Sequence, residues 1–184
     1  FSCNVACHSL GGDRSNSLNQ SIIKGGRAEQ VVGSVDARVF DASGRPVAYC
    51  KYSEDQSCLQ HVNYLHQGRV WKRDTYHSSG RISRTQFIDP TTGLARHEVY
   101  FNRQQQVVLT RFCELVSGKV STAKIILHLQ GSSPVEFCSD GELILYWLRG
   151  LVNQTQGRLV FCCDRIRLFA EPLSRLMAES DPRR

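Results

Sequence analysis

The sequence predicts an α+β protein, in which an extended antiparallel β-meander with a period of about 12 residues is followed by a partial, Rossmann-like α/β segment. Glycines recur across residues 39–119 at intervals of 24, 12, 13 and 25 residues, each equal to one or two periods. The residues between them are rich in β-branched and aromatic side chains, and after residue 130 the pattern changes to helix, strand and helix. The periodic glycines are Gly44, Gly68, Gly80, Gly93 and Gly118.

Each periodic glycine marks a tight turn, because glycine adopts positive φ without steric cost. Two positions at which the period skips a glycine fall near residues 56 and 105–106. The clearest predicted strands span residues 69–76, 81–88, 94–101 and 107–112, and a last one spans 120–129. Polar residues occupy both alternating faces, with Arg84 and Gln86 on one and Ser83 and Thr85 on the other, which predicts a sheet wetted on both sides. An ordinary all-β domain with regular turns is the alternative.

We divide the chain into three parts. Residues 1–30 are rich in Gly, Ser and Asn and form a flexible or truncated N-terminal segment, with a short helix over 16–24. Residues 31–130 form the meander, beginning with a strand in 31–40, and residues 131–184 form the partial α/β segment. The chain starts with Phe1 rather than Met, which makes a fragment boundary one interpretation of its beginning.

A capping box opens the α/β segment. Ser139 and Glu142 have the spacing at which a serine hydroxyl and a glutamate carboxylate satisfy the free amides at a helix start. The predicted helix runs to about residue 152. Its expected apolar stripe contains Leu143, Trp147, Leu148 and Leu151.

A nearly continuous apolar run over residues 158–163 predicts a buried parallel strand. Asp164 and Arg165 follow at its carboxyl end, where open α/β sheets bind ligands, so both are candidate ligand residues. Asp164 as a helix cap is the alternative. Pro172 is expected in the first turn of a last helix of about ten residues.

The net charge of +6 is concentrated on the meander. Residues 38–119 hold twelve Lys and Arg against seven Asp and Glu, a balance of +5. A basic sheet face attracts a polyanion. A solvated face whose charges protect strand edges from aggregation is the alternative.

The eight cysteines show no Cys-x-x-Cys pair and no zinc-like spacing, so we expect no metal and no cofactor. Reduced thiols fit a cytoplasmic protein. The longest apolar run, residues 143–148, is far shorter than the ~20 residues that span a bilayer, so no transmembrane segment is expected.

Residues 73–89, followed by Thr92-Gly93 and the strand ending at Tyr100-Phe101, resemble the extended β-sheet domain of certain bacterial glycosyltransferases. These are the poly(glycerol-phosphate) α-glucosyltransferases and the related enzymes that glycosylate serine-rich adhesins beside the accessory secretion system. Residues 140–144, 147–148 and 161–165 are similar to the point where that family's chain re-enters its first Rossmann domain. The resemblance covers about residues 36–170.

The resemblance implies the N-terminal part of a two-domain GT-B enzyme that transfers hexose from a UDP-sugar, with retention, to a cell-wall polymer or an adhesin protein. The sheet of that family mediates self-association and helps to hold the acceptor. The donor-binding domain would lie beyond residue 184, so UDP-sugar is expected only through a missing domain and no catalytic residue is assigned. Glu171 and Glu179 share the eight-residue separation of that domain's glutamate pair, but we do not transfer the role to them.

The resemblance also implies an anionic cell-wall polymer or a glycoprotein acceptor as partner, a homo-oligomer through the sheet, and a cytoplasmic location or a peripheral one at the inner membrane face. A stand-alone, non-enzymatic β-repeat module with a binding or structural role is the alternative. Nucleic acid is not expected, because stacking aromatic residues interleaved with arginines would be needed and those present serve equally well in a core. The candidate acceptor contacts are Arg69, Lys72, Arg73, Arg81, Arg84 and Arg96.

Overall fold

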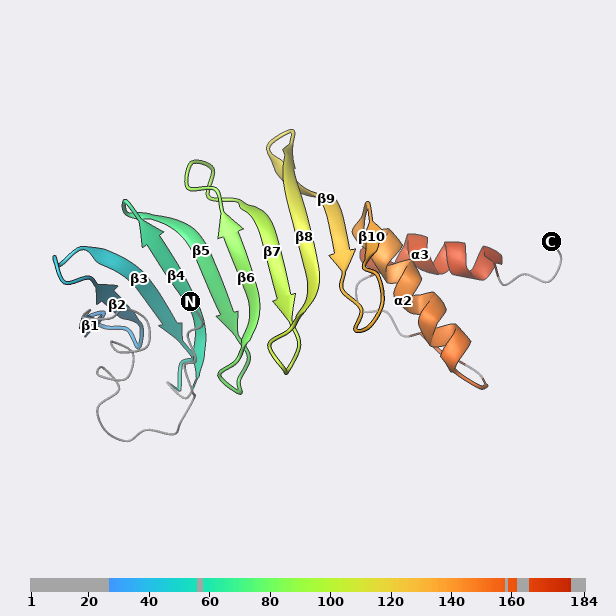
Figure 1. The fold of residues 1–184 in the computed structure, drawn as a ribbon, viewed down its shortest axis with the longest axis horizontal. Helices are drawn as coiled ribbons and strands as arrows, with labels where there is room; N and C mark the ends of the chain where they lie inside the picture. Colours follow the sequence, from blue (N-terminus) through green and yellow to red (C-terminus); the bar gives the residue numbers. More distant parts are fainter. Residues whose placement is uncertain (1–26, 56–57, 158, 162–165, 180–184) are drawn as a thin grey trace.

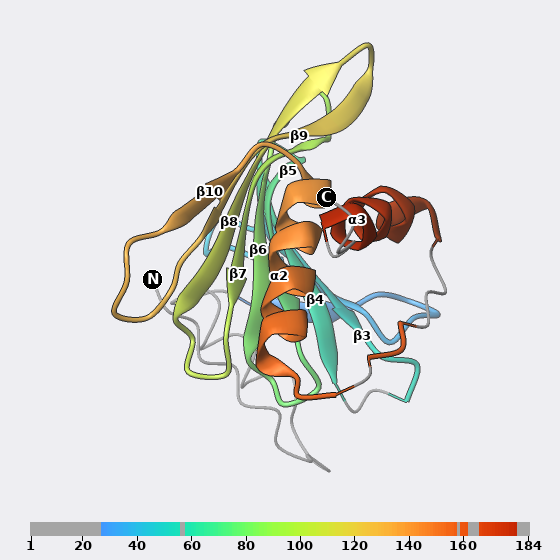
Figure 2. The ribbon, with the colours of Figure 1, turned by 90° about the vertical axis from the view of Figure 1, so that its right-hand side faces the viewer.

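A computed structural model describes residues 27–55, 58–157, 159–161 and 166–179, which form one ten-stranded sheet and two helices. All neighbouring strands are antiparallel and follow one another in chain order from β1 to β10, which confirms the predicted meander (Figure 1). The β8–β9 hairpin projects beyond the other turns at its end of the sheet (Figure 2). The strands are β1 (Arg27–Gln30), β2 (Ala37–Phe40), β3 (Pro46–Tyr52), β4 (Leu59–His66), β5 (Arg69–Tyr76), β6 (Ile82–Ile88), β7 (Ala95–Phe101), β8 (Val107–Val116), β9 (Lys119–Leu127) and β10 (Val135–Phe137).

The periodic glycines lie in the turns, as their spacing predicts. Gly68 and Gly118 each follow a residue that also has positive φ, as the favoured two-residue hairpin turns require. In the β7–β8 turn, at a position where the period skips a glycine, Gln105 takes the left-handed conformation, with φ 61°.

The main hydrophobic core lies on one face of β2–β5. Cross-strand register places Ala37, Cys50 and Val62 in one row across these strands, and this row is buried. The same row continues into β5 and β6 as Asp74 and Thr85, whose side chains are buried and hydrogen-bonded to each other at 2.6 Å. The main buried apolar cluster therefore lies in the first half of the meander, and one buried polar pair, Asp74 and Thr85, continues the row at β5 and β6.

The opposite face carries polar side chains across its middle strands. The register aligns one residue from each of β4 to β8, and we call the surface that they define the polar face. The predicted presence of polar residues on both faces of β6 agrees with this arrangement. The defining residues are Asn63, Arg73, Gln86, Glu98 and Arg111.

Three rings stack across the core-bearing face of β6, β7 and β8. The ring centroids of Phe87 and His97 are 5.2 Å apart, and those of His97 and Phe112 are 4.8 Å apart with nearly parallel planes. Both faces of the His97 ring are therefore covered, and only its edge is left for other contacts. The stack thus supports the sheet where the buried apolar cluster ends.

Two helices follow the sheet, α2 (Asp140–Gln154) and α3 (Ile166–Glu179), and they pack against each other beside the last strands (Figure 2). The capping box is confirmed: the Glu142 amide donates to the Ser139 hydroxyl at 3.2 Å, and the Glu142 carboxylate accepts from the Cys138 amide at 2.8 Å. The predicted stripe of α2 is wrong in part. Trp147 is 54% exposed, because Leu145 and Leu148 face α3 instead.

Three further sequence expectations differ from the structure. Pro172 lies inside α3 rather than in its first turn, because the helix already begins at Ile166. Residues 159–161 form no strand, and Val160 is 72% exposed, because they have no strand partner in the described sheet. The first meander strand begins at Ala37 and pairs with β1, which falls in the segment that we expected to be flexible.

The predicted helix over residues 16–24, Cys162, Cys163, Asp164 and Arg165 lie outside the described residues. Among the described cysteines, Cys50, Cys113 and Cys138 are free thiols. Neither described helix has the length and apolar character that crossing a membrane requires.

Candidate functional site

The six basic residues chosen from the sequence do not form one cluster. Antiparallel register places them on both faces of β5–β7 and at both ends of these strands. Their contacts divide them into those whose charge is neutralised by a carboxylate and those whose charge is not. This division decides which of them are available to an anionic ligand.

Arg69 and Arg73 line an open hollow of about 490 Å³ beside the β6–β7 turn. The Arg69 guanidinium donates to the Pro90 carbonyl at 3.2 Å, and the Arg73 guanidinium donates to the Asn63 side-chain oxygen at 2.6 Å. Both acceptors are neutral, so in the described part of the chain no carboxylate compensates the positive charge of either guanidinium group. Val70 and Ile88 add an apolar part to the lining.

Lys72 and Arg96 are held by carboxylates. The Lys72 ammonium lies 2.9 Å from the buried Asp74 carboxylate and 4.6 Å from the centre of the Tyr64 ring. The Arg96 guanidinium lies 3.0 Å from Asp89 in the β6–β7 turn. The backbone amide of Thr91 and the Arg96 guanidinium hold the pKa of Asp89 below its usual value. These two basic residues have internal partners.

Arg84 belongs to a network on the polar face that is centred on Glu98. This glutamate is only 6% exposed, and its carboxylate accepts hydrogen bonds from Gln86 at 2.6 Å and from Tyr100 at 2.9 Å. The guanidinium groups of Arg84 and Arg111 lie 3.8 and 3.7 Å from its oxygens. Burial and the hydrogen bond to Glu98 raise the pKa of the Tyr100 phenol, which stays a donor to the carboxylate.

The network extends from the sheet to the first turn of α2. Arg111 also pairs with Asp140, and the Thr122 hydroxyl donates to the same Asp140 carboxylate at 2.9 Å. Asp140 is well placed at a helix N-terminus, where the backbone dipoles favour negative charge. One chain of contacts therefore joins Glu98 to the helical segment. Our sequence analysis missed Glu98, Arg111 and Asp140, although the alternation of the polar residues in β6 gave a signal for this face.

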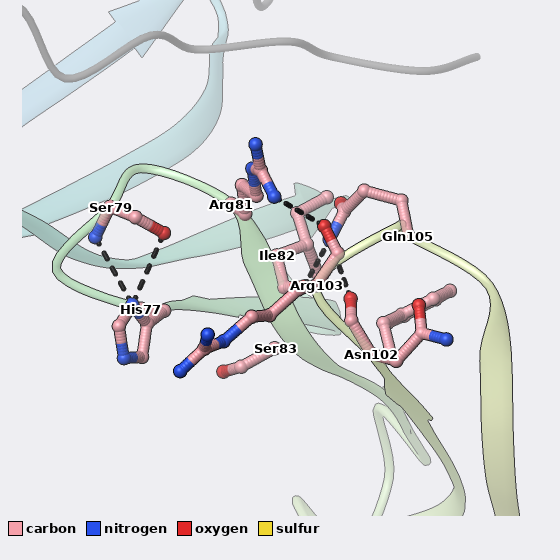
Figure 3. Close-up of a pocket in the computed structure, with 9 residues that line it drawn as sticks. His77, Ser79, Arg81, Ile82, Ser83, Asn102, Arg103 and Gln105 are labelled. Atoms are coloured by element: carbon pink, nitrogen blue, oxygen red, sulfur yellow. Dashed lines mark hydrogen bonds between the residues drawn. The ribbon is translucent and has the colours of Figure 1, made fainter.

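Arg81 lies at the other end of the strands, in a hollow of about 390 Å³ between the β5–β6 and β7–β8 turns (Figure 3). Its guanidinium donates to the backbone carbonyl of Arg103. His77 and Ser83 line the same hollow, and so does the side chain of Arg103, which our candidate list did not include. Among the described parts of the chain, no cluster of three His, Cys, Asp or Glu residues is arranged to hold a metal ion.

No family model matches the sequence, and no curated protein matches it. The fold, however, matches parts of several solved structures. A Staphylococcus aureus TarM variant in complex with fondaparinux, α-GlcNAc-glycerol and UDP shares 14% identity and a TM-score of 0.56, over 77% of this chain and 27% of that one. The pneumococcal O-GlcNAc transferase GtfA in complex with UDP and GlcNAc shares 15% identity and a TM-score of 0.55, over 74% of this chain and 25% of that one.

The glycosylation-associated Gap123 complex of Streptococcus agalactiae matches over 82% of this chain and 29% of that one, with 15% identity and a TM-score of 0.58. The chain thus spans just over a quarter of the length of the first matching structures. At these identities the likeness shows the fold alone. The resemblance seen in the sequence is confirmed at that level: the meander with its adjoining helices has the fold of a part of these glycosyltransferases and glycosylation-associated proteins.

Proposed function

We propose that this chain is the acceptor-binding and assembly portion of a GT-B glycosyltransferase, which transfers hexose from a UDP-sugar to a cell-wall polymer or an adhesin protein in the cytoplasm. The observation that carries the proposal is the match of most of this chain to about a quarter of TarM and of the O-GlcNAc transferase GtfA. In this proposal the donor sugar is bound by another part of the enzyme. The meander holds the acceptor and takes part in self-association.

Exposed apolar residues beside the helices support a longer protein. Trp147 on α2, Val160 after it and Met177 on α3 are all more than half exposed. Exposed apolar surface marks an interaction site where it is contiguous. A Rossmann domain that follows the meander would cover them.

The charges on the sheet support an anionic acceptor. Arg69 and Arg73 share one hollow and are bonded to neutral acceptors, so their charge is available to a phosphate or carboxylate group. Guanidinium groups bind such anions with two parallel hydrogen bonds, which makes the contact selective as well as strong. Lys72, Arg84 and Arg96 have carboxylate partners, and in this proposal they stabilise the sheet that presents the first two.

The test is binding of poly(glycerol phosphate) to the purified chain and to two double variants with equal charge change. Arg69→Gln with Arg73→Gln removes the two unpaired guanidinium groups of this hollow and is expected to weaken binding about tenfold or more, since hydrogen bonds to charged groups contribute about 1.5–3 kcal/mol each. Arg45→Gln with Arg149→Gln is the matched control, because Asp41 and Glu179 already pair with these arginines. Equal weakening by the two double variants would remove the hollow from the acceptor site.

The regularity of the turns favours a second candidate function, a stand-alone β-repeat module with a structural role. The β2–β3, β5–β6 and β7–β8 turns share the same pair of backbone hydrogen bonds. Such a module would hold no anionic polymer. Undetectable binding of poly(glycerol phosphate) by the wild-type chain at low salt would favour it over the proposed function.

A further inference from the structure

We propose that the hollow between the β5–β6 and β7–β8 turns binds a phosphoryl group carried by a polyol or a sugar. The inference deepens the proposed function, on which it rests only for the source of the ligand. It concerns a different end of the sheet from the hollow of Arg69 and Arg73. Figure 3 shows the residues that form it.

A comparison of turns of the same type shows why charge is left uncompensated here. In the β2–β3 turn, the first residue is Asp41, and its carboxylate accepts from the Arg45 guanidinium at 3.1 Å. In the β5–β6 turn, His77 takes the place of the aspartate, and Arg81 takes the place of Arg45. Arg81 therefore has no carboxylate in its own turn and donates to a backbone carbonyl of the next turn.

The described lining of the hollow contains positively charged side chains and no carboxylate. Arg81 and Arg103 both line it, and within the described residues neither forms an ion pair with a carboxylate. The Ser79 amide donates to Nδ1 of His77 at 3.2 Å, so the proton of the neutral imidazole is on Nε2. Two guanidinium groups beside a histidine in one concave site are an arrangement suited to an anion.

A strained residue holds the two turns together. Gln105 has φ 61°, whereas the equivalent positions in the other two turns are Gly44 and Gly80, with φ 80° and 78°. Residues with a side chain rarely adopt this backbone conformation. Here the side-chain amide of Gln105 donates a hydrogen bond to the Ile82 carbonyl in β6 at 2.8 Å. Strained backbone that the surrounding contacts hold in place is concentrated at binding sites. The Gln105 and Arg81 bonds thus fix both walls of the hollow.

The remaining lining selects the chemistry of the ligand. The Ser83 hydroxyl donates to the Thr75 carbonyl at 3.1 Å, so its oxygen is left to accept from a ligand hydroxyl. Ile82 and Phe101 add apolar surface for a carbon skeleton. Guanidinium groups for the anion, an acceptor for hydroxyls and an apolar wall together match a phosphorylated polyol better than a free inorganic ion.

The test is a titration of the ¹⁵N-labelled chain with glycerol 1-phosphate, and separately with inorganic phosphate, followed by amide chemical shifts. We expect saturable shifts in residues 78–82 and 102–106, with tighter binding of glycerol 1-phosphate than of inorganic phosphate. Arg103→Gln should weaken binding about tenfold or more. Arg45→Gln, at the turn whose arginine is already paired, should leave it unchanged.

Three results would overturn the inference in distinct ways. Shifts absent from these two turns, or equal weakening by Arg45→Gln, would show that the hollow holds no anion of its own. Equal affinity for the two probes would show a site for free phosphate without the polyol. If glycerol 1-phosphate does not bind in this hollow but poly(glycerol phosphate) still binds to the chain, the proposed function stands. Polymer binding is tested separately, with the Arg69→Gln and Arg73→Gln double variant.

Discussion

The Glu98 network provides the sharpest test of how the polar face is stabilised. Glu98→Ala removes a carboxylate that accepts from Gln86 and Tyr100 and lies between Arg84 and Arg111. Breaking a buried ion pair costs about 3–5 kcal/mol, but the two arginine side chains are 34% and 28% exposed, and water screens part of their charge. We therefore expect the free energy of unfolding to fall by about 3 kcal/mol.

The assay is equilibrium urea unfolding monitored by circular dichroism. Glu98→Gln, which keeps the side-chain volume but loses the charge, should have about half the effect of the alanine variant. Glu114→Ala is the control, since this glutamate lies in β8 and is exposed. Surface substitutions of this kind change stability by about 0.5 kcal/mol or less. A Glu98→Ala effect as small as that of the control would refute the view that this carboxylate holds the middle strands together.

Two further predictions concern titratable groups. Burial raises the pKa of the Cys50 thiol to about 12, so Cys50 should resist iodoacetamide at pH 8 in the folded chain, whereas the exposed Cys138 reacts. Mass spectrometry of the alkylated peptides distinguishes the two cysteines. Equal alkylation rates would contradict the buried position of Cys50. The Ser43 hydroxyl and the Arg45 amide lower the pKa of Asp41 to about 2. The ionised form of Asp41 therefore stabilises the turn fully at pH values above the usual carboxyl pKa near 4, and this contribution to stability is lost as the pH falls through 2. Asp41→Asn should therefore lower the melting temperature much more at pH 7 than at pH 2, and a pH-independent difference would contradict the assignment.

The meander was predictable from the sequence because its signal is local. Each of the five periodic glycines lies in a hairpin turn at positive φ, and the predicted strand over residues 69–76 coincides with β5. The cap of α2 was predictable for the same reason, since Ser139 and Glu142 are three residues apart and contact each other directly.

The candidate site was less predictable because it depends on register and on partners far apart in the sequence. Lys72 and Arg73 are adjacent in the chain, yet one meets a buried aspartate and the other an asparagine on the opposite face. Glu98 acquires its role only when β6, β7 and β8 align. The apolar run that includes Val160 has the composition of a buried strand, but a strand also needs a neighbour with which to pair.

The salt dependence of poly(glycerol phosphate) binding to the wild-type chain decides whether the sheet holds an anionic acceptor. Isothermal titration calorimetry measures it, with neutral dextran as the control polymer. Screening shortens the range of electrostatic attraction from about 10 Å at 0.1 M salt to about 3 Å at 1 M. We predict binding at low salt that is lost at high salt, and no binding of dextran. Absence of binding at low salt, or affinity that salt leaves unchanged, would contradict an acceptor site built on the unpaired arginines.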